Sequence, residues 1–161
     1  MEVLLVRHAK SSYDWEKYPT DAERPLSKKG RQRQTKVAKG LKKLKLTFDL
    51  AWVSPYARAQ ETLKILREII VPFVETMVVE ELTPDGDEDK TLILLRKQAV
   101  ETPTIRLLIV SHNPLVSSLL QLIEVSKSTP EMKTSDVALC EITSKESKLI
   151  KYYSREELMN N

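Results

Sequence analysis

Short apolar runs recur along the chain, and each ends abruptly at polar residues. Residues 2–6, 48–53 and 106–110 are rich in valine, leucine and isoleucine and are too short for helices, so they predict strands. Runs of this kind with few polar interruptions are typical of parallel strands that are buried on both faces of a sheet. The pattern therefore predicts a central sheet covered by other elements on each side.

Three further segments have the composition of strands. Residues 74–79 are a fourth candidate, and residues 137–142 and 149–153 predict two closing strands. The polar residues 144–147 between the last two segments suit the turn of an edge hairpin.

Between the strands the apolar residues recur with the period of a helix. Ser27 is the expected N-cap of a first helix whose apolar positions continue through Leu44. Pro55 suits the first position of a second helix that runs to Ile70. Residues 87–100 predict a third helix.

A fourth helix is expected over residues 115–123, with Asn113 as its cap and Pro114 in its first turn. The alternation of strands and helices predicts an α/β fold, a three-layer sandwich with a mostly parallel central sheet flanked by helices on both faces. A length of 161 residues without repeats or linkers is expected to form a single domain, residues 1–161.

The scarcity of glycine and cysteine excludes several functional classes. The three glycines cannot form a G-x-G-x-x-G or P-loop motif anywhere in the sequence. The single cysteine, Cys140, excludes an intrachain disulfide and is typical of a reducing compartment. A cysteine phosphatase of the C-x5-R type would need arginine where Glu146 stands. No apolar stretch is long enough for a membrane span or a signal peptide, so we expect a cytoplasmic protein without a membrane partner.

Charge is distributed unevenly along the chain. Residues 1–60 contain 14 basic and 6 acidic residues, whereas the remainder contains 12 and 17, so the N-terminal part should attract anions. Residues 24–45 carry ten Lys or Arg and no acid, which could indicate nucleic-acid binding. Their helical apolar stripe favours a solvated helix face instead, and no nucleic-acid partner is expected. The acidic residues 85–89 lack the spacing of a calcium loop and predict a helix start.

The candidate chemistry lies where the predicted strands end. Both histidines of the chain, His8 and His112, directly follow such strands, and Arg7 and Arg58 stand beside strand ends as well. Open α/β sheets bind ligands at the carboxyl ends of their strands, so these four side chains should share one site. An imidazole can attack phosphorus and form a covalent intermediate, and guanidinium forks hold phosphate oxygens.

We assign His8 as the nucleophile, with Arg7, Arg58 and His112 as donors to the phosphate. Arg58 should lie one turn inside the helix begun by Pro55, whose terminal amides add positive potential. No Asp or Glu lies within four residues of either histidine, so neither a metal nor another cofactor is expected.

These residues resemble motifs of a known family. The segments 7–10, 54–62 and 111–114 are similar to the Arg-His-Gly signature, the second arginine motif and the second histidine motif of the histidine phosphatase superfamily, which is phosphoglycerate mutase-like. Segments 24–30 and 81–87 are similar to those of SixA-type phosphohistidine phosphatases. Ala9 replaces the glycine of the signature, which requires an ordinary backbone dihedral at that position.

The resemblance implies that His8 accepts the phosphate, that Arg7, Arg58 and His112 form its pocket, and that Arg24 contributes to substrate binding. The expected activity is metal-independent removal of phosphate, from phosphohistidine on a protein. Two alternatives stay open: a phosphatase of small phosphate esters or sugar phosphates, which would need a general acid such as Glu81, and a non-catalytic anion- or protein-binding module of the same fold. The aromatic residues Tyr13, Trp15 and Tyr18 either line the rim of the pocket or anchor a loop.

Overall fold

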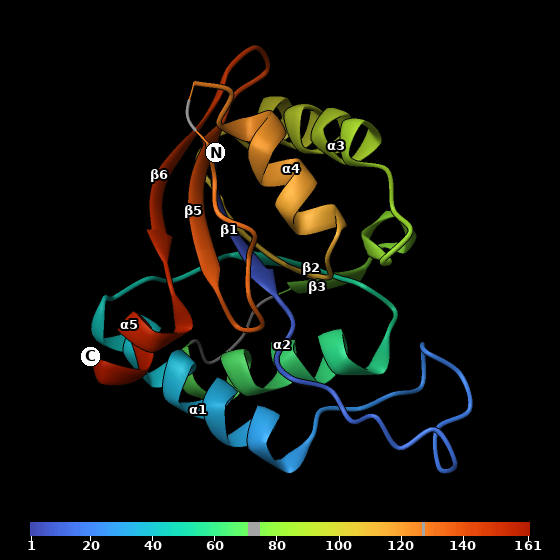
Figure 1. Ribbon diagram of the computed structural model, residues 1–161. Helices are drawn as coiled ribbons and strands as arrows, with labels where there is room; N and C mark the ends of the chain where they lie inside the picture. The colour runs from blue at the N-terminus through green and yellow to red at the C-terminus, as the bar shows by residue number, and fades with distance from the viewer. Residues whose placement is uncertain (71–74, 127) are drawn as a thin grey trace.

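A six-stranded sheet with strand order β3-β2-β4-β1-β5-β6 forms the centre of the molecule (Figure 1). The computed structural model describes residues 1–70, 75–126 and 128–161. The first four strands in this order run parallel, and β5 and β6 are antiparallel to their neighbours. The strands are β1 (Glu2–Arg7), β2 (Leu50–Val53), β3 (Glu75–Val78), β4 (Arg106–Ser111), β5 (Val137–Ile142) and β6 (Ser147–Tyr153).

The predicted fold class is confirmed, including the mostly parallel sheet and the closing hairpin of β5 and β6. The strand over residues 137–142 has the predicted bounds, and the ends of the other strands differ from the prediction by at most two residues, because the sequence pattern does not show where ladder hydrogen bonds stop. Residue 74 of the fourth predicted strand lies outside the described residues.

The apolar strands are buried on both faces, as their composition predicts. In β1, Val3 and Leu5 face one core, whereas Leu4 and Val6 face the other. This alternation follows from the two-residue period of a strand. Each strand of the sheet centre therefore contributes to two separate hydrophobic layers.

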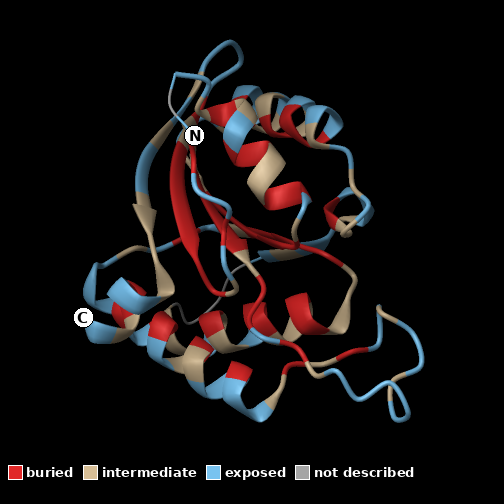
Figure 2. Cartoon of the chain, viewed as in Figure 1, coloured by how far each residue is buried: buried red, intermediate tan, exposed pale blue. Residues whose placement is uncertain are grey.

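Helices cover the two faces of the sheet (Figure 1). On one face, α1 (Lys28–Lys43) packs against α2 (Ala57–Ile70) and α5 (Arg155–Asn160), and on the other α3 (Glu88–Glu101) packs against α4 (Leu115–Ile123). Figure 2 shows buried residues on the sides of these helices that face the sheet and exposed residues on their outer sides. No helix among the described residues combines the length and apolar character needed to cross a membrane.

The helix starts confirm the predicted N-cap Ser27 and correct two other predictions. Ser27 accepts a hydrogen bond from Gly30 N. Asp87, in the acidic segment that is expected to begin a helix, is the N-cap of α3 and accepts a hydrogen bond from Lys90 N. Pro55 is not the first helical residue, because α2 begins at Ala57. Arg58 is thus the second residue of that helix and lies at its very start.

Asn113 is not the cap of α4, contrary to the prediction. Its peptide bond to Pro114 is cis, and Pro114 itself is the N-cap residue, without a side-chain capping bond. The Asn113 side chain instead accepts from Ser117 Oγ and donates to Met132 O and the carboxylate of Glu131. Asn113 therefore joins α4 to the loop that precedes β5.

Candidate active site

His8 lies directly after β1, in the centre of the sheet. Its backbone N–H donates to Ser111 O at 2.9 Å, which ties it to the end of the neighbouring strand β4. The residue is 7% exposed, and its Nδ1 lies 2.7 Å from Ala9 O. A carbonyl oxygen only accepts hydrogen bonds, so Nδ1 carries the proton. In the neutral ring, Nε2 is left with the free lone pair that a nucleophile needs.

His112 follows β4 and lies beside His8, with 4.8 Å between the ring centroids. Its Nε2 is 2.7 Å from Ser54 Oγ, the side chain of a residue just after β2. Its Nδ1 is buried and has no hydrogen-bond partner among the described residues. If Ser54 donates to Nε2, Nδ1 carries the ring proton and is available as a donor to an anion beside His8.

Both imidazoles are held in the neutral form. Burial, with a smaller effect from the positive charges of Arg58 and Arg7, lowers the pKa of His8 to about 3, although the hydrogen bond to Ala9 O opposes the shift. Burial also lowers the pKa of His112, followed by the effect of His8 and the arginines. A neutral His8 at physiological pH is the reactive form for attack on phosphorus.

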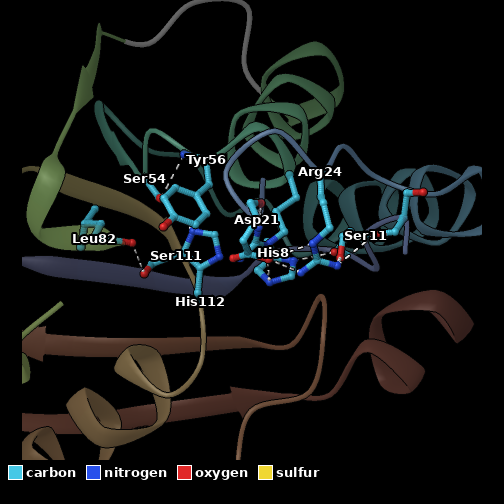
Figure 3. A network of polar contacts seen from close by, with 12 residues as sticks. His8, Ser11, Asp21, Arg24, Ser54, Tyr56, Leu82, Ser111 and His112 are labelled. Atoms are coloured by element: carbon cyan, nitrogen blue, oxygen red, sulfur yellow. Dashed lines mark hydrogen bonds and ion pairs between the residues drawn. The ribbon is translucent and has the colours of Figure 1, made fainter. Parts of the chain in front are cut away.

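Arg58 brings a buried guanidinium group to the nucleophile. Its Nε donates to His8 Nε2 at 3.3 Å. Its two terminal nitrogens donate to Asp21, one to the backbone carbonyl at 2.7 Å and one to the carboxylate at 2.9 Å. Figure 3 shows His8 between the Ser54 and His112 pair on one side and the group formed by Asp21, Arg24 and Ser11 on the other.

Arg7 is the last residue of β1, and the loop before β5 holds it in place. Its Nη1 donates to Met132 O at 2.7 Å, and Ser135 N donates to the Arg7 carbonyl at 3.0 Å. Its Nε is buried without a partner among the described residues, so one donor of the fork is available to a ligand. Sequence reasoning assigned no role to this loop, because its residues carry no recognisable motif.

Arg24 joins the site through a carboxylate that sequence reasoning missed. Its guanidinium donates to Asp21 Oδ1, with Nε at 2.8 Å, and to Ser11 Oγ and Ser12 O. Asp21 thereby bridges Arg24 and Arg58. No hydrogen bond joins Arg24 to His8 in the described part of the chain, and most donors of Arg24 already have protein acceptors.

Electrostatics keeps this bridging carboxylate ionised. Burial raises the pKa of Asp21, but hydrogen bonds from Arg24 and Arg58 outweigh that effect, so its pKa lies below the usual value. Asp21 stands in a polar loop, and no sequence signal separated it from the other acidic residues nearby.

Thr62 connects the nucleophile loop to the helix that carries Arg58. Its hydroxyl donates to Arg58 O at 2.7 Å and accepts from Ala9 N at 3.0 Å. Ala9 is fully buried and does not have a positive φ, as its replacement of glycine requires. The hydroxyl of Thr62 therefore fixes the distance between the His8 loop and the Arg58 helix.

Glu81 lies in the 3-10 turn η1 (Glu80–Leu82), which is anchored to the site region. Ser111 Oγ donates to Leu82 O at 2.7 Å, so the turn is attached to the residue before His112. The side chain of Glu81 is exposed to solvent. A Cβ atom on Gly86 would lie 2.1 Å from Glu81 O, so only glycine allows the backbone to pass there.

Other potential reactive groups lie away from this site. Burial raises the pKa of Cys140 to about 12, which leaves its thiol protonated in the core. In the described part of the chain, no three His, Cys, Asp or Glu side chains converge in a way that could hold a metal ion.

The geometry at the strand ends agrees with the comparisons with known proteins. Residues 3–85 match the family model of the histidine phosphatase superfamily, branch 1. The chain belongs to this superfamily. Phosphohistidine phosphatase SixA of Escherichia coli strain K12 is 30% identical to this histidine phosphatase over 139 residues, which is 86% of this chain and 83% of that protein.

Solved structures extend the likeness over the whole histidine phosphatase. The protein histidine phosphatase SixA in complex with tungstate superposes with a TM-score of 0.90 at 27% identity and covers 98% of this chain and 99% of that chain. A structure described as a putative phosphohistidine phosphatase SixA from Agrobacterium tumefaciens has a TM-score of 0.78 at 20% identity over 95% and 97%, which supports the fold. The resemblance to SixA-type phosphatases expected from the motifs is confirmed.

Proposed function

We propose that this histidine phosphatase removes phosphate from phosphohistidine on a protein, by way of a phosphohistidine intermediate on His8. The observation that carries the proposal is the unprotonated Nε2 of His8, whose lone pair accepts a hydrogen bond from the Arg58 guanidinium while Nδ1–H is held by Ala9 O. Arg7 and His112 each have a buried nitrogen without a protein partner among the described residues, and these nitrogens would donate to the phosphate oxygens. Arg24 would act on the substrate through Asp21 and Arg58.

In the first step, the Nε2 lone pair of His8 attacks phosphorus. The bond between phosphorus and the substrate imidazole breaks, and its electron pair stays on the departing nitrogen, which takes a proton from solvent. The hydrogen bond from Nδ1 to Ala9 O persists and stabilises the positive charge that the His8 ring acquires. The Nε–H of Arg58, which donates a hydrogen bond to His8 Nε2 before the attack, then donates to a phosphate oxygen instead.

In the second step, water attacks the phosphorus atom held on His8. The bond between phosphorus and Nε2 breaks and its electron pair returns to Nε2. Both protons of the water leave with the phosphate, so His8, which keeps its proton on Nδ1, returns to its neutral state. No metal takes part in either step of the proposed reaction.

The short segment between Glu81 and β4 supports a protein substrate, because it leaves room for one helix and for no insertion that would enclose a small substrate. About 24 residues separate Glu81 from β4, and they contain α3, which packs against α4 on the sheet. Small-ester phosphatases enclose their substrates and protonate an alkoxide, whereas a nitrogen leaving group needs less help from an enzymic acid. The relationship to SixA of E. coli supports the same choice.

Chemical trapping tests the proposal. The enzyme is incubated with a phosphohistidine-containing protein carrying labelled phosphate and quenched rapidly in base. We expect one label that is lost in acid and maps to His8, and no label in the His8→Ala variant. Label on a serine that is stable in acid would refute the mechanism.

Inhibition and chelation provide a second test of the same proposal. Activity should persist after exhaustive treatment with EDTA, and tungstate or vanadate should inhibit by occupying the phosphate position. Activity that is lost with EDTA and restored by a divalent ion would assign the protein to another mechanism.

We also propose a cytoplasmic location. The single cysteine, which is buried and unpaired, supports a reducing compartment.

A further inference from the structure

Two exposed aromatic side chains stand beside the catalytic site, on the loop between β1 and α1. Tyr13 is 68% exposed and Trp15 is 52% exposed. The loop projects beyond the ends of α1 and α2 in Figure 1 and is largely exposed in Figure 2. The catalytic reaction described above uses neither ring.

Both rings pack on the same buried cation. The guanidinium carbon of Arg24 lies 5.0 Å from the ring centroid of Tyr13 and 4.8 Å from that of Trp15. Arg24 is 8% exposed and is held by Asp21, Ser11 and Ser12. We call Tyr13, Trp15 and the Arg24 beneath them the aromatic platform.

The loop that carries the platform is folded on itself by hydrogen bonds. Asp14 N donates to Ser12 Oγ, and the Asp14 side chain accepts from Lys17 N. Trp15 N donates to Tyr13 O at 3.1 Å. The rings are therefore presented in a fixed arrangement, which lowers the entropy cost of binding on their outer surfaces.

The platform is connected to the reacting atoms by an unbroken set of contacts. Arg24 and Arg58 share the carboxylate of Asp21, and Arg58 contacts His8 Nε2. These contacts place the loop that carries the two rings next to the group that holds the phosphate in the proposed reaction. A substrate larger than a phosphate group thus meets the aromatic rings next to the site.

We infer that the aromatic platform is the docking surface for the polypeptide around the phosphohistidine of the substrate, and that it binds apolar side chains flanking that residue. The inference rests on the proposed function. Rigid, partly exposed tyrosine and tryptophan rings are the residues that most often contribute large shares of binding energy in protein interfaces. The outer surfaces of both rings are apolar, and their inner surfaces are already satisfied by Arg24, so they select for apolar contact.

A set of defined substrates tests this inference. Phosphoramidate and N-acetyl phosphohistidine methylamide probe the pocket, and two nine-residue phosphohistidine peptides probe the platform, one with leucine on both sides of the phosphohistidine and one with glycine. For the wild-type enzyme we expect the leucine peptide to have a kcat/KM about tenfold above that of the glycine peptide, from burial of apolar side chains. The difference should lie in KM.

The double variant Tyr13→Ala/Trp15→Ala should remove that preference and leave phosphoramidate turnover within about twofold of the wild type. Tyr13→Phe/Trp15→Phe keeps both aromatic faces and should retain the preference. The matched control is Ile93→Ala/Val100→Ala, which removes two exposed apolar side chains, each 65% exposed, from α3 on the opposite face of the sheet. It should change none of these values.

The outcomes separate failure of this inference from failure of the proposed function. Equal wild-type rates on the two peptides, or a leucine preference that survives in the alanine double variant, would overturn the inference. An equal loss on phosphoramidate and on the peptides would overturn it as well, because the rings would then only support Arg24. A wild-type enzyme that hydrolyses phosphate esters but no phosphohistidine compound would overturn the proposed function itself.

Discussion

Arg58 donates its Nε–H to the Nε2 lone pair of His8 at 3.3 Å, so the guanidinium group and the proposed nucleophile contact each other directly. This contact orients the imidazole and occupies the lone pair until a phosphate oxygen competes for the same donor. Asp21 holds the two terminal nitrogens of Arg58 and keeps the guanidinium in the plane that reaches His8. The arrangement couples substrate binding to release of the nucleophile.

Replacing Arg58 with lysine should damage catalysis severely. A single ammonium group cannot contact His8, the Asp21 carbonyl and the Asp21 carboxylate together, and it cannot hold two phosphate oxygens as a fork does. We expect kcat/KM to fall by about 10²-fold or more, in steady-state assays with a phosphohistidine substrate. Arg31→Lys, which alters an exposed arginine paired with Glu61, is the control and should keep normal activity. Near-normal turnover by Arg58→Lys would remove Arg58 from the pocket.

Thr62→Val should destabilise the protein and slow catalysis. The substitution keeps the side-chain shape but leaves the buried Ala9 N–H without its acceptor. Such a loss costs about 1–3 kcal/mol of unfolding free energy, which urea denaturation measures. We also expect kcat/KM to fall about tenfold, because the His8 loop is no longer tied to the Arg58 helix. Thr62→Ser retains the hydroxyl and should keep most of the activity; equal activities of the two variants would contradict the proposed connection.

The free energy of unfolding should fall at acid pH because His8 is neutral in the folded protein. Burial lowers its pKa to about 3, whereas a histidine in the unfolded chain titrates near 6.5. Between these values the unfolded chain binds a proton that the folded protein does not, so the stabilisation is complete above pH 6.5 and declines as the pH falls toward 3. His8→Asn should reduce the slope of unfolding free energy against pH by up to about 1.4 kcal/mol per pH unit between about pH 4 and 6. Parallel curves for the variant and the wild type would show that His8 titrates normally.

The effect of Glu81→Gln should differ between the two candidate substrate classes, because their leaving groups differ in how much they need a general acid. On phosphohistidine, Glu81→Gln should lower kcat only modestly, since solvent can supply the proton to the departing nitrogen. Any side activity on alkyl phosphates should fall by about 10²-fold, the usual contribution of a positioned general acid. Glu80→Gln alters a neighbouring carboxylate of the same turn and is the matched control.

The pattern of losses in that experiment has a defined meaning. Large and equal losses on both substrates would make Glu81 the general acid and favour a phosphate-ester phosphatase. Negligible losses of kcat on both substrates would show that Glu81 is a solvent-exposed residue without a catalytic role. His8→Ala sets the zero level for both reactions, because both use the same nucleophile.

Local sequence determined the architecture and placed the candidate reacting groups at the ends of strands. The apolar runs that end at Arg7, Val53 and Ser111 form adjacent parallel strands, so their carboxyl ends meet at one edge. Because β1 and β4 are parallel neighbours, the residues that follow them, His8 and His112, lie side by side. Their prediction succeeded because strand burial on both faces leaves an unbroken apolar pattern that is visible in the sequence.

Tertiary structure decided which polar groups hold these residues in place. Asp21 reaches Arg58 across 37 positions of sequence, and Met132 O receives Arg7 across 125, so no local pattern could reveal either partner. The low pKa of His8 also depends on burial by distant segments and on arginines from separate elements. A sequence specifies which side chains can form an active site, but distances, tautomers and proton affinities arise from packing between elements, which local periodicity does not encode.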